Sequence, residues 1–278
     1  QNINNNSTNQ RIDFYSYSLD MIKQKPFFGI GIGNWKIESI PYLLKNRNSY
    51  TVAYHSHNDF LQVGAELGLI GLILYIFIFC FAFYMLYKLY NKGVIDKLQT
   101  EAIFLFLVAY LIDANLNFPI SRVIIQIILM FVFSFLVVEY SVISNISSRF
   151  KYFKNLWLII FLISPFIIYL NFRVFKSFQQ QTKLLADFNS RHFSGDINEI
   201  GNFEMEYPNI GVTALPLKAI IANYYSVTKP EKAIELALKS SEDNPYLYFG
   251  DIVASKISSD YSILCLEKFF QSKSIQYV

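Results

Sequence analysis

Four long apolar segments constrain the fold of this chain more than any other feature of its sequence. The strongest is 67–90, which carries no charge before Lys88 and is long enough to cross a hydrocarbon core about 30 Å thick. Three more follow at 102–118, 123–138 and 156–170. Hydrophobic residues make up 53% of the chain and charged residues only 16%, so the apolar excess must face lipid. We therefore predict an all-α fold, a polytopic bundle of about four transmembrane helices.

The connections between these segments predict how the bundle is threaded. Only 119–122 separates the second segment from the third, so these two should form a hairpin in the membrane. The fourth segment is the shortest and contains Pro165, which is expected to kink it. The first and third connections are rich in basic residues, which are Lys88, Lys92, Lys97, Arg149, Lys151 and Lys154.

The distribution of basic residues predicts the orientation of the bundle. Short basic connections face the cytoplasm, and the hairpin connection has only Arg122. Arg173 and Lys176, just beyond the fourth segment, count against this orientation. The prediction divides the chain into three parts, with extracytoplasmic segments before and after the membrane domain: 1–66, 67–170 and 171–278.

Charge and cysteine content exclude other classes of protein. A net charge of +3 with scattered basic residues gives no electrostatic footprint for nucleic acid. Cys80 and Cys265 are too far apart to indicate a disulfide framework or a zinc site. No carboxylate pair or His-Cys cluster with ligand spacing lies near His55 and His57, so we expect no metal, and we expect no cofactor. The chain begins at Gln1 without a signal peptide, and we expect further spanning helices upstream.

The segment before the first span contains most of the candidate catalytic and binding residues. Tyr15, Leu19 and Ile22 recur at helical spacing, and Pro26 marks where that short amphipathic helix must stop. Alternating glycines then follow in FGIGIGN, at 29–33. Such a pattern fits a phosphate cradle or a plain tight turn, and we prefer the turn.

A histidine motif, YHSHND, leads directly into the first span. Ser56 followed by Asp59 resembles a capping box, which would place His57 and Asn58 in the first helical turn, where free amides favour an anion such as phosphate. Asp59, Gln62 and Glu66 then share one helix face, which should point into the protein.

The order of these motifs resembles the O-antigen ligase and polymerase superfamily of bacterial membrane proteins. An Arg in RIDFYSYSLD precedes PFFGIGIGNW, and a variable loop leads to HSHNDFLQVGAELGLIGLILY, over roughly residues 8 to 145. The resemblance implies a metal-independent glycosyltransferase of the inner membrane, whose active segment faces the periplasm. Its donor is an undecaprenyl-diphosphate-linked glycan, and the acceptor of a ligase is the lipid A core.

The resemblance also assigns roles to individual residues. The family's periplasmic Arg falls on Arg11, whose planar guanidinium suits a diphosphate, and its motif His falls on His57, whose imidazole suits deprotonation of an acceptor hydroxyl. His55 could be the base instead, with His57 as a capping residue, and Arg11 could be an ordinary surface arginine. Glu66 could pair with Arg11. The expected substrate-binding residues are His55, Asn58, Glu66, Arg122 and Asp113.

Other functions remain compatible with the same residues. An O-antigen polymerase would use a second lipid-linked glycan as acceptor, and a protein O-oligosaccharyltransferase would use a protein. A non-catalytic polysaccharide exporter or membrane scaffold would need only the spans, and the HSHN motif beside a glycine turn argues against it.

The C-terminal part predicts a separate helical unit. Segment 217–240 reads as two short helices joined at 228–230, and Tyr224, Ala233 and Pro245 fall at the spacings of one tetratricopeptide repeat. A second pair is expected over 248–270 with looser spacing. Such a tail could bind a protein partner or cap the membrane domain. His192 is expected to have no chemical role.

Overall fold

The structure is a computed structural model that describes residues 3–46, 52–144, 156–193, 197–203, 207–211 and 213–258. Over these residues the regular structure is helical, apart from one isolated bridge between Ile210 and Pro216, so the predicted all-α class is confirmed. The chain divides into two compact units, Gln1–Leu156 and Trp157–Val278, and each is described by itself.

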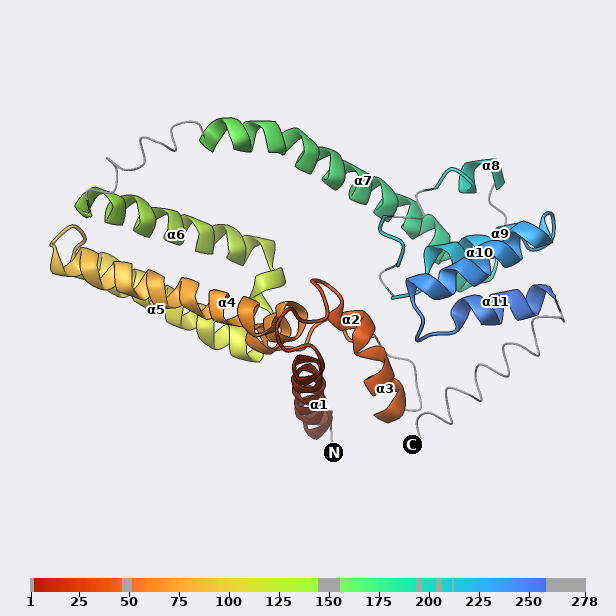
Figure 1. Ribbon diagram of the computed structural model, residues 1–278, viewed down its shortest axis with the longest axis horizontal. Helices are drawn as coiled ribbons and strands as arrows, with labels where there is room; N and C mark the ends of the chain where they lie inside the picture. The colour runs from red at the N-terminus through yellow and green to blue at the C-terminus, as the bar shows by residue number, and fades with distance from the viewer. Residues whose placement is uncertain are drawn as a thin grey trace. The chain divides into compact units, whose positions relative to one another are not determined.

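The first unit has three spanning helices preceded by an outer segment. The outer segment contains α1 (Ile3–Gln24), α2 (Trp35–Glu38) and α3 (Ile40–Asn46), and the spanning part contains α4 (Asp59–Asn91), α5 (Lys97–Leu116), a 3-10 turn η1 (Pro119–Ser121) and α6 (Val123–Ile143). In Figure 1, α4, α5 and α6 run side by side, and α4 packs against both others. Their length and composition suit a membrane span.

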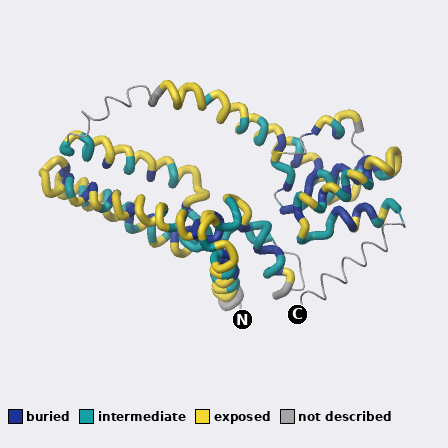
Figure 2. Tube along the Cα trace, viewed as in Figure 1, coloured by how far each residue is buried: buried dark blue, intermediate teal, exposed yellow. Residues whose placement is uncertain are grey.

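The spanning helices bury little of their own surface. A narrow core joins them, built around Phe79, Leu86, Leu107 and Leu136. Exposed apolar residues cover the outward sides of α4, α5 and α6, as Figure 2 shows. Because lipid is as apolar as a protein core, this distribution is typical of membrane helices, and the chain is a membrane protein.

The predicted amphipathic helix of the outer segment is present, and the face that it buries differs from the stripe of Tyr15, Leu19 and Ile22 in the sequence. The helix α1 ends at Gln24, just before Pro26 as expected. Its buried face consists of Phe14, Tyr17, Ser18 and Met21, whereas Leu19 is 46% exposed. The two stripes differ by about one position in register, and contacts with Trp35 and Leu43 decide which one is buried.

The second unit begins with one long helix. This helix, α7 (Leu156–Ser190), passes through Pro165 and extends well beyond the predicted end of the fourth apolar segment near residue 170. Its described part from Leu158 is long and apolar enough to span a membrane. The prediction of a fourth span is therefore supported by length and composition, but the polar tail begins inside the same helix.

Short helices form the rest of the second unit. They are α8 (Ile197–Ile200), α9 (Leu217–Tyr225), α10 (Pro230–Asp243) and α11 (Phe249–Ile257). The helix α10 packs against both α9 and α11, around a core that includes Ile220, Ala233 and Ala237. The predicted break at 228–230 separates α9 from α10. Of the second predicted pair, 248–270, the first part is present as α11, and the part after Ser258 lies outside the described residues. The likeness to a tetratricopeptide repeat stays a prediction.

Candidate active site

The glycine turn forms backbone hydrogen bonds with α4 at a break in that helix. Gly68 has φ 69° and ψ −172°, so the helix is interrupted there and its regular hydrogen bonds are lost. The Leu69 amide would bond to the Ala65 carbonyl in a continuous helix. Instead, the Leu69 amide donates to the Pro26 carbonyl at 2.7 Å, and the Ala65 carbonyl accepts from the Ile30 amide at 2.9 Å.

A third bond completes this exchange between the turn and α4. The Gly31 amide donates to the Glu66 carbonyl at 2.9 Å. The turn therefore satisfies backbone groups that a helix break at the edge of a membrane would leave unpaired. This is the physical role of FGIGIGN in this structure, and it favours the tight turn over the phosphate cradle.

Close backbone contact explains two of the glycines. A Cβ at Gly68 would overlap the Phe27 carbonyl, and a Cβ at Gly29 would overlap the backbone of Ala65 and Glu66. Both positions also have positive φ, a region that disfavours other residues.

Glu66 is bound by the polypeptide rather than by a cation. Its side chain is 9% exposed, and its Oε1 accepts from the Trp35 amide at 3.2 Å and from Gln62 Nε2 at 3.4 Å. The Trp35 indole N–H in turn donates to Ser18 Oγ at 2.9 Å. Glu66 therefore connects α4 to the start of α2, and the hypothesis that it pairs with Arg11 is wrong.

The helix α4 starts later than the capping-box prediction placed it. Asn58 is the N-cap, and its Oδ1 accepts from the Leu61 amide at 3.0 Å. Ser56 forms a local turn instead, because its Oγ bonds to the amide and carbonyl of Asn58. His57 therefore precedes the helix, in a left-handed conformation with φ 59°, and the prediction that His57 and Asn58 lie in the first turn is wrong.

The end of α5 forms another wall around the histidine motif. Arg11 donates from Nη1 to the Leu116 carbonyl at 3.2 Å, and Asn58 Nδ2 donates to the Asn115 carbonyl at 3.2 Å. The Tyr15 hydroxyl lies within hydrogen-bonding distance of the His57 and Asn115 carbonyls, at 3.1 and 3.3 Å. The Asn115 and Leu116 carbonyls lie at the C-terminus of α5 and have no partner within the helix, which explains why donors gather there.

The two motif histidines line one pocket of about 520 Å³ in the outer segment. The His55 ring stacks on Phe118 with centroids 4.4 Å apart, and the His57 ring meets the same Phe118 edge-on at 5.2 Å. The other face of His57 lies over Phe14, at 6.2 Å. Both Nδ1 atoms are buried without a hydrogen-bond partner. The remaining lining residues are Gln10, Val52, Ala53 and Tyr54.

Burial keeps both imidazoles neutral near pH 7. Burial is the main cause that lowers the pKa of His57 below its ordinary value, followed by the positive charge of Arg11 and by repulsion from His55 when that ring is protonated. Burial also lowers the pKa of His55, against the opposing effect of a hydrogen bond with Gln62. A neutral imidazole can accept a proton, so either histidine is chemically competent as a base.

Asp59 is a candidate that the sequence did not single out. It is fully buried, its Oδ2 accepts from the Ile120 amide at 2.9 Å, and its Oδ1 has no partner. It therefore fixes the α5–α6 connection, which carries Phe118, against the start of α4. The signals in the sequence were its place in the capping-box pattern with Ser56 and on the polar helix face with Gln62 and Glu66.

The two remaining predicted residues lie on the hairpin. Arg122 is exposed and its guanidinium lies over the Phe118 ring at 5.2 Å, next to the histidine pocket. Asp113 is half-buried and accepts from Asn117 Nδ2 at 2.6 Å, which joins the last turn of α5 to its C-cap. Among the described residues there is no group of three or more side chains suited to hold a metal ion.

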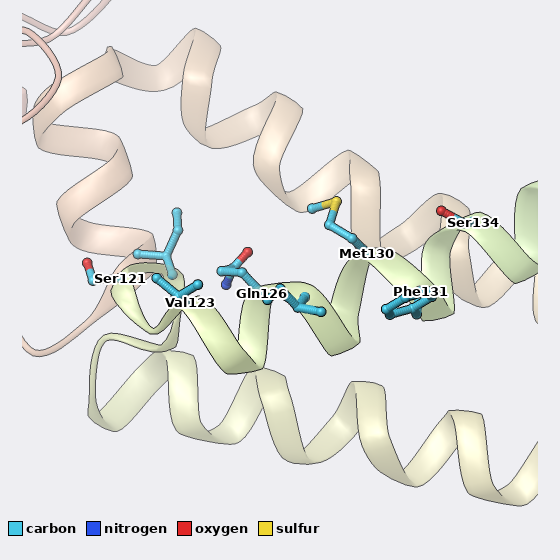
Figure 3. Close-up of a pocket in the computed structure, with 8 residues that line it drawn as sticks. Ser121, Val123, Gln126, Met130, Phe131 and Ser134 are labelled. Atoms are coloured by element: carbon cyan, nitrogen blue, oxygen red, sulfur yellow. The ribbon is translucent and has the colours of Figure 1, made fainter. Parts of the chain in front are cut away.

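An apolar groove of about 410 Å³ begins at the same connection and follows α6 (Figure 3). Gln126 is held at its edge by hydrogen bonds to the Tyr110 hydroxyl and the Pro119 carbonyl, at 2.9 and 3.0 Å. Phe118 lines the histidine pocket and Ile120 lines the groove, so this short connection contributes a residue to each. The groove is lined by Ile120, Ser121, Val123, Gln126, Ile127, Met130, Phe131 and Ser134.

Comparison with known proteins finds a match to the segment that contains the histidine motif. The sequence model of one family, described as O-antigen ligase, matches residues 2–76. No curated protein and no solved structure matches the chain. The matched range includes α1, the glycine turn, the histidine motif and the break at Gly68, but it ends before the hairpin. The segment that supplies most of the pocket is therefore similar to the O-antigen ligase family, as its motifs predicted.

Proposed function

We propose that this chain transfers a glycan from an undecaprenyl-diphosphate carrier to an acceptor hydroxyl at the periplasmic face of the inner membrane. The observation that carries the proposal is the pocket of His55 and His57 at the end of the spanning helices, within the segment that resembles O-antigen ligases. The lipid A core is the proposed acceptor.

His57 is the proposed base. Its neutral imidazole takes the proton of the acceptor hydroxyl as that oxygen attacks the anomeric carbon, and the bond from this carbon to the diphosphate oxygen breaks. Burial, the nearby charge of Arg11 and the unpartnered Nδ1 support this assignment.

Arg11 and Arg122 are the proposed partners of the leaving diphosphate. The charge of Arg11 acts on His57, and Arg122 lies over Phe118, the ring that both histidines contact. A guanidinium binds phosphate oxygens through paired N–H donors and stays charged, so the diphosphate can leave without being protonated. One donor of Arg11 is used by Leu116, which leaves others for a ligand.

The carrier lipid is proposed to lie in the groove along α6. The groove is apolar and lies along the spanning helix α6, and its residue Ile120 is two positions from Phe118 of the histidine pocket. A carrier with its diphosphate at the pocket would have its lipid chain beside Val123 and Ile127. Asp113 and Asn58 are proposed to contact sugar hydroxyls at the rim of the pocket. Each would use hydrogen-bonding positions that its bond to Asn117 or to the Asn115 carbonyl leaves open.

Lipid-linked intermediates in a deletion strain test this function. A ligase leaves long, capped glycans on the carrier without attachment to lipid A, and wild-type chain should restore attachment whereas His57→Ala at equal membrane level should not. Accumulation of single unlinked repeats would indicate a polymerase. Unchanged glycans would refute enzymatic glycan transfer and leave the scaffold hypothesis.

A further inference from the structure

The glycine turn exposes three large apolar side chains. Phe27, Phe28 and Ile32 are 64%, 80% and 76% exposed, and we call them the turn patch. Their backbone is fixed by the bonds to α4, so this exposure is a property of an ordered turn. Contact of such side chains with water is unfavourable in proportion to their area, which raises the question of what covers them.

The bonds between the turn and α4 set the depth of the turn patch. From Leu69, the first residue after the break, to Tyr90 the helix measures about 33 Å, close to the hydrocarbon thickness of a bilayer. Tyr87, Lys88 and Tyr90 at the far end are typical of a membrane–water boundary. Leu69 therefore lies at the opposite boundary, and its 2.7 Å bond to Pro26 places the turn there as well.

The turn patch also continues an exposed apolar surface of α4. Leu69, Ile70 and Ile73 are exposed directly after the break, on a helix whose length and composition suit a membrane span. Phe27 follows the residue that bonds to Leu69, so the two apolar surfaces adjoin. Lys25 is exposed at the start of the turn, and a lysine next to an apolar surface suits the phosphate level of a bilayer.

We propose that the turn patch inserts into the outer leaflet and is covered by acyl chains of membrane lipids. Inserted apolar side chains beside a lysine are a common mode of interfacial anchoring. The anchor would hold the histidine pocket at the level of the lipid head groups, because the turn is bonded to the segment that leads into α4. This inference does not depend on the reaction proposed above.

Depth-dependent fluorescence quenching tests the insertion on the full chain. Phe28→Cys and Ile32→Cys variants, in a Cys80→Ala and Cys265→Ala background, would carry an NBD label in vesicles of phosphatidylethanolamine and phosphatidylglycerol. Ile73→Cys on α4 is the lipid-facing reference, and Thr8→Cys on the polar part of α1 is the aqueous reference. Both labelled turn positions should show blue-shifted emission and the strong quenching by doxyl-labelled lipid seen at Ile73→Cys.

Two other outcomes would overturn the proposal. Quenching by aqueous iodide to the extent seen at Thr8→Cys would mean that the turn patch faces water. Protection from both quenchers would mean that protein covers the turn patch, either another part of a longer chain or a second copy. Because Phe28 and Ile32 are exposed, the substitutions remove no core packing, and equal membrane levels of all variants would verify this.

Discussion

At the scale of single residues, His55 and His57 occupy different positions around one ring, Phe118. His55 stacks on the ring, whereas His57 meets it edge-on and also lies against Phe14. The sequence predicted both as candidates, but it could not predict Phe118 as their shared contact, because that residue follows a helix far along the chain. Asp59 was missed for the same reason, since its partner is the amide of Ile120.

The first prediction separates the two histidines. His57→Ala should lower turnover by roughly a hundredfold or more, the usual scale for a positioned general base, with little change in donor binding. His55→Ala is the matched variant and should mainly weaken binding. Single-turnover rates and donor affinity, measured on purified protein, would distinguish them. An active His57→Ala protein beside an inactive His55→Ala protein would transfer the role of base to His55.

The second prediction concerns the pH dependence of the reaction. A base must be neutral, and burial and Arg11 lower the pKa of His57, so kcat/KM should stay high below pH 6.5 and fall only as the pH drops through that lowered pKa. Arg11→Gln removes one cause of the lowering and should move this acid limb to higher pH. Arg11→Lys keeps the charge and should leave the limb in place.

The same pair of variants tests the proposed role of Arg11 in binding. Both Arg11→Gln and Arg11→Lys should raise KM for the donor, because neither substituent offers the planar pair of donors that matches a diphosphate. Full activity of Arg11→Lys with an unchanged KM would remove Arg11 from diphosphate binding and leave it with the Leu116 carbonyl alone.

At the scale of elements, the break in α4 and the glycine turn form one structural unit. The glycine turn was visible in the sequence, but the break at Gly68 and its pairing with the turn were not, because both depend on backbone contacts between segments distant in the chain. The spans were easier to predict, since length and hydropathy are local properties. The prediction of the first residue of α4 was wrong, because Ser56, Asn58 and Asp59 can each cap a helix and only the surrounding contacts select Asn58.

The third prediction tests this unit with two glycines of equal φ. Gly68 and Gly93 both have φ 69°, but a Cβ at Gly93 meets nothing within 4 Å, whereas one at Gly68 would overlap Phe27. Gly93→Ala should cost about 1–2 kcal/mol for left-handed strain. Gly68→Ala should cost about 1–3 kcal/mol more, the usual range for overpacking. Thermal unfolding in detergent would compare them, and equal Tm values would contradict the close contact.

The fourth prediction concerns Asp59 and the α5–α6 connection. Asp59→Ala leaves the Ile120 amide without its acceptor and should destabilise the protein by about 1–3 kcal/mol. Asp59→Asn keeps a carbonyl oxygen and should recover most of that loss. Unfolding midpoints of the two variants provide the measurement. If the alanine variant were as stable as wild type, Asp59 would not be what holds the connection in place.

At the scale of the whole molecule, the number of spans and the helical class followed from composition and segment length. Apolar residues exceed what a protein of this length can bury, so helices that face lipid were the only consistent outcome. Composition and segment length could not predict the histidine pocket, because α1, the motif loop and the end of α5 all contribute to it. A motif could identify its own residues but not the other walls.

The last prediction concerns the sides of the membrane on which the two polar parts lie. The basic residues of the connections 92–97 and 145–155 predict that both face the cytoplasm, so the histidine motif and the C-terminal helices should both be extracytoplasmic. Tyr54→Cys and Glu231→Cys, both at exposed positions, should then react with an impermeant maleimide added to intact cells, and Lys92→Cys should react only after lysis. The background is Cys80→Ala and Cys265→Ala. Labelling of Tyr54→Cys without Glu231→Cys would show that α7 does not cross the membrane, and labelling of Lys92→Cys in intact cells would reverse the orientation.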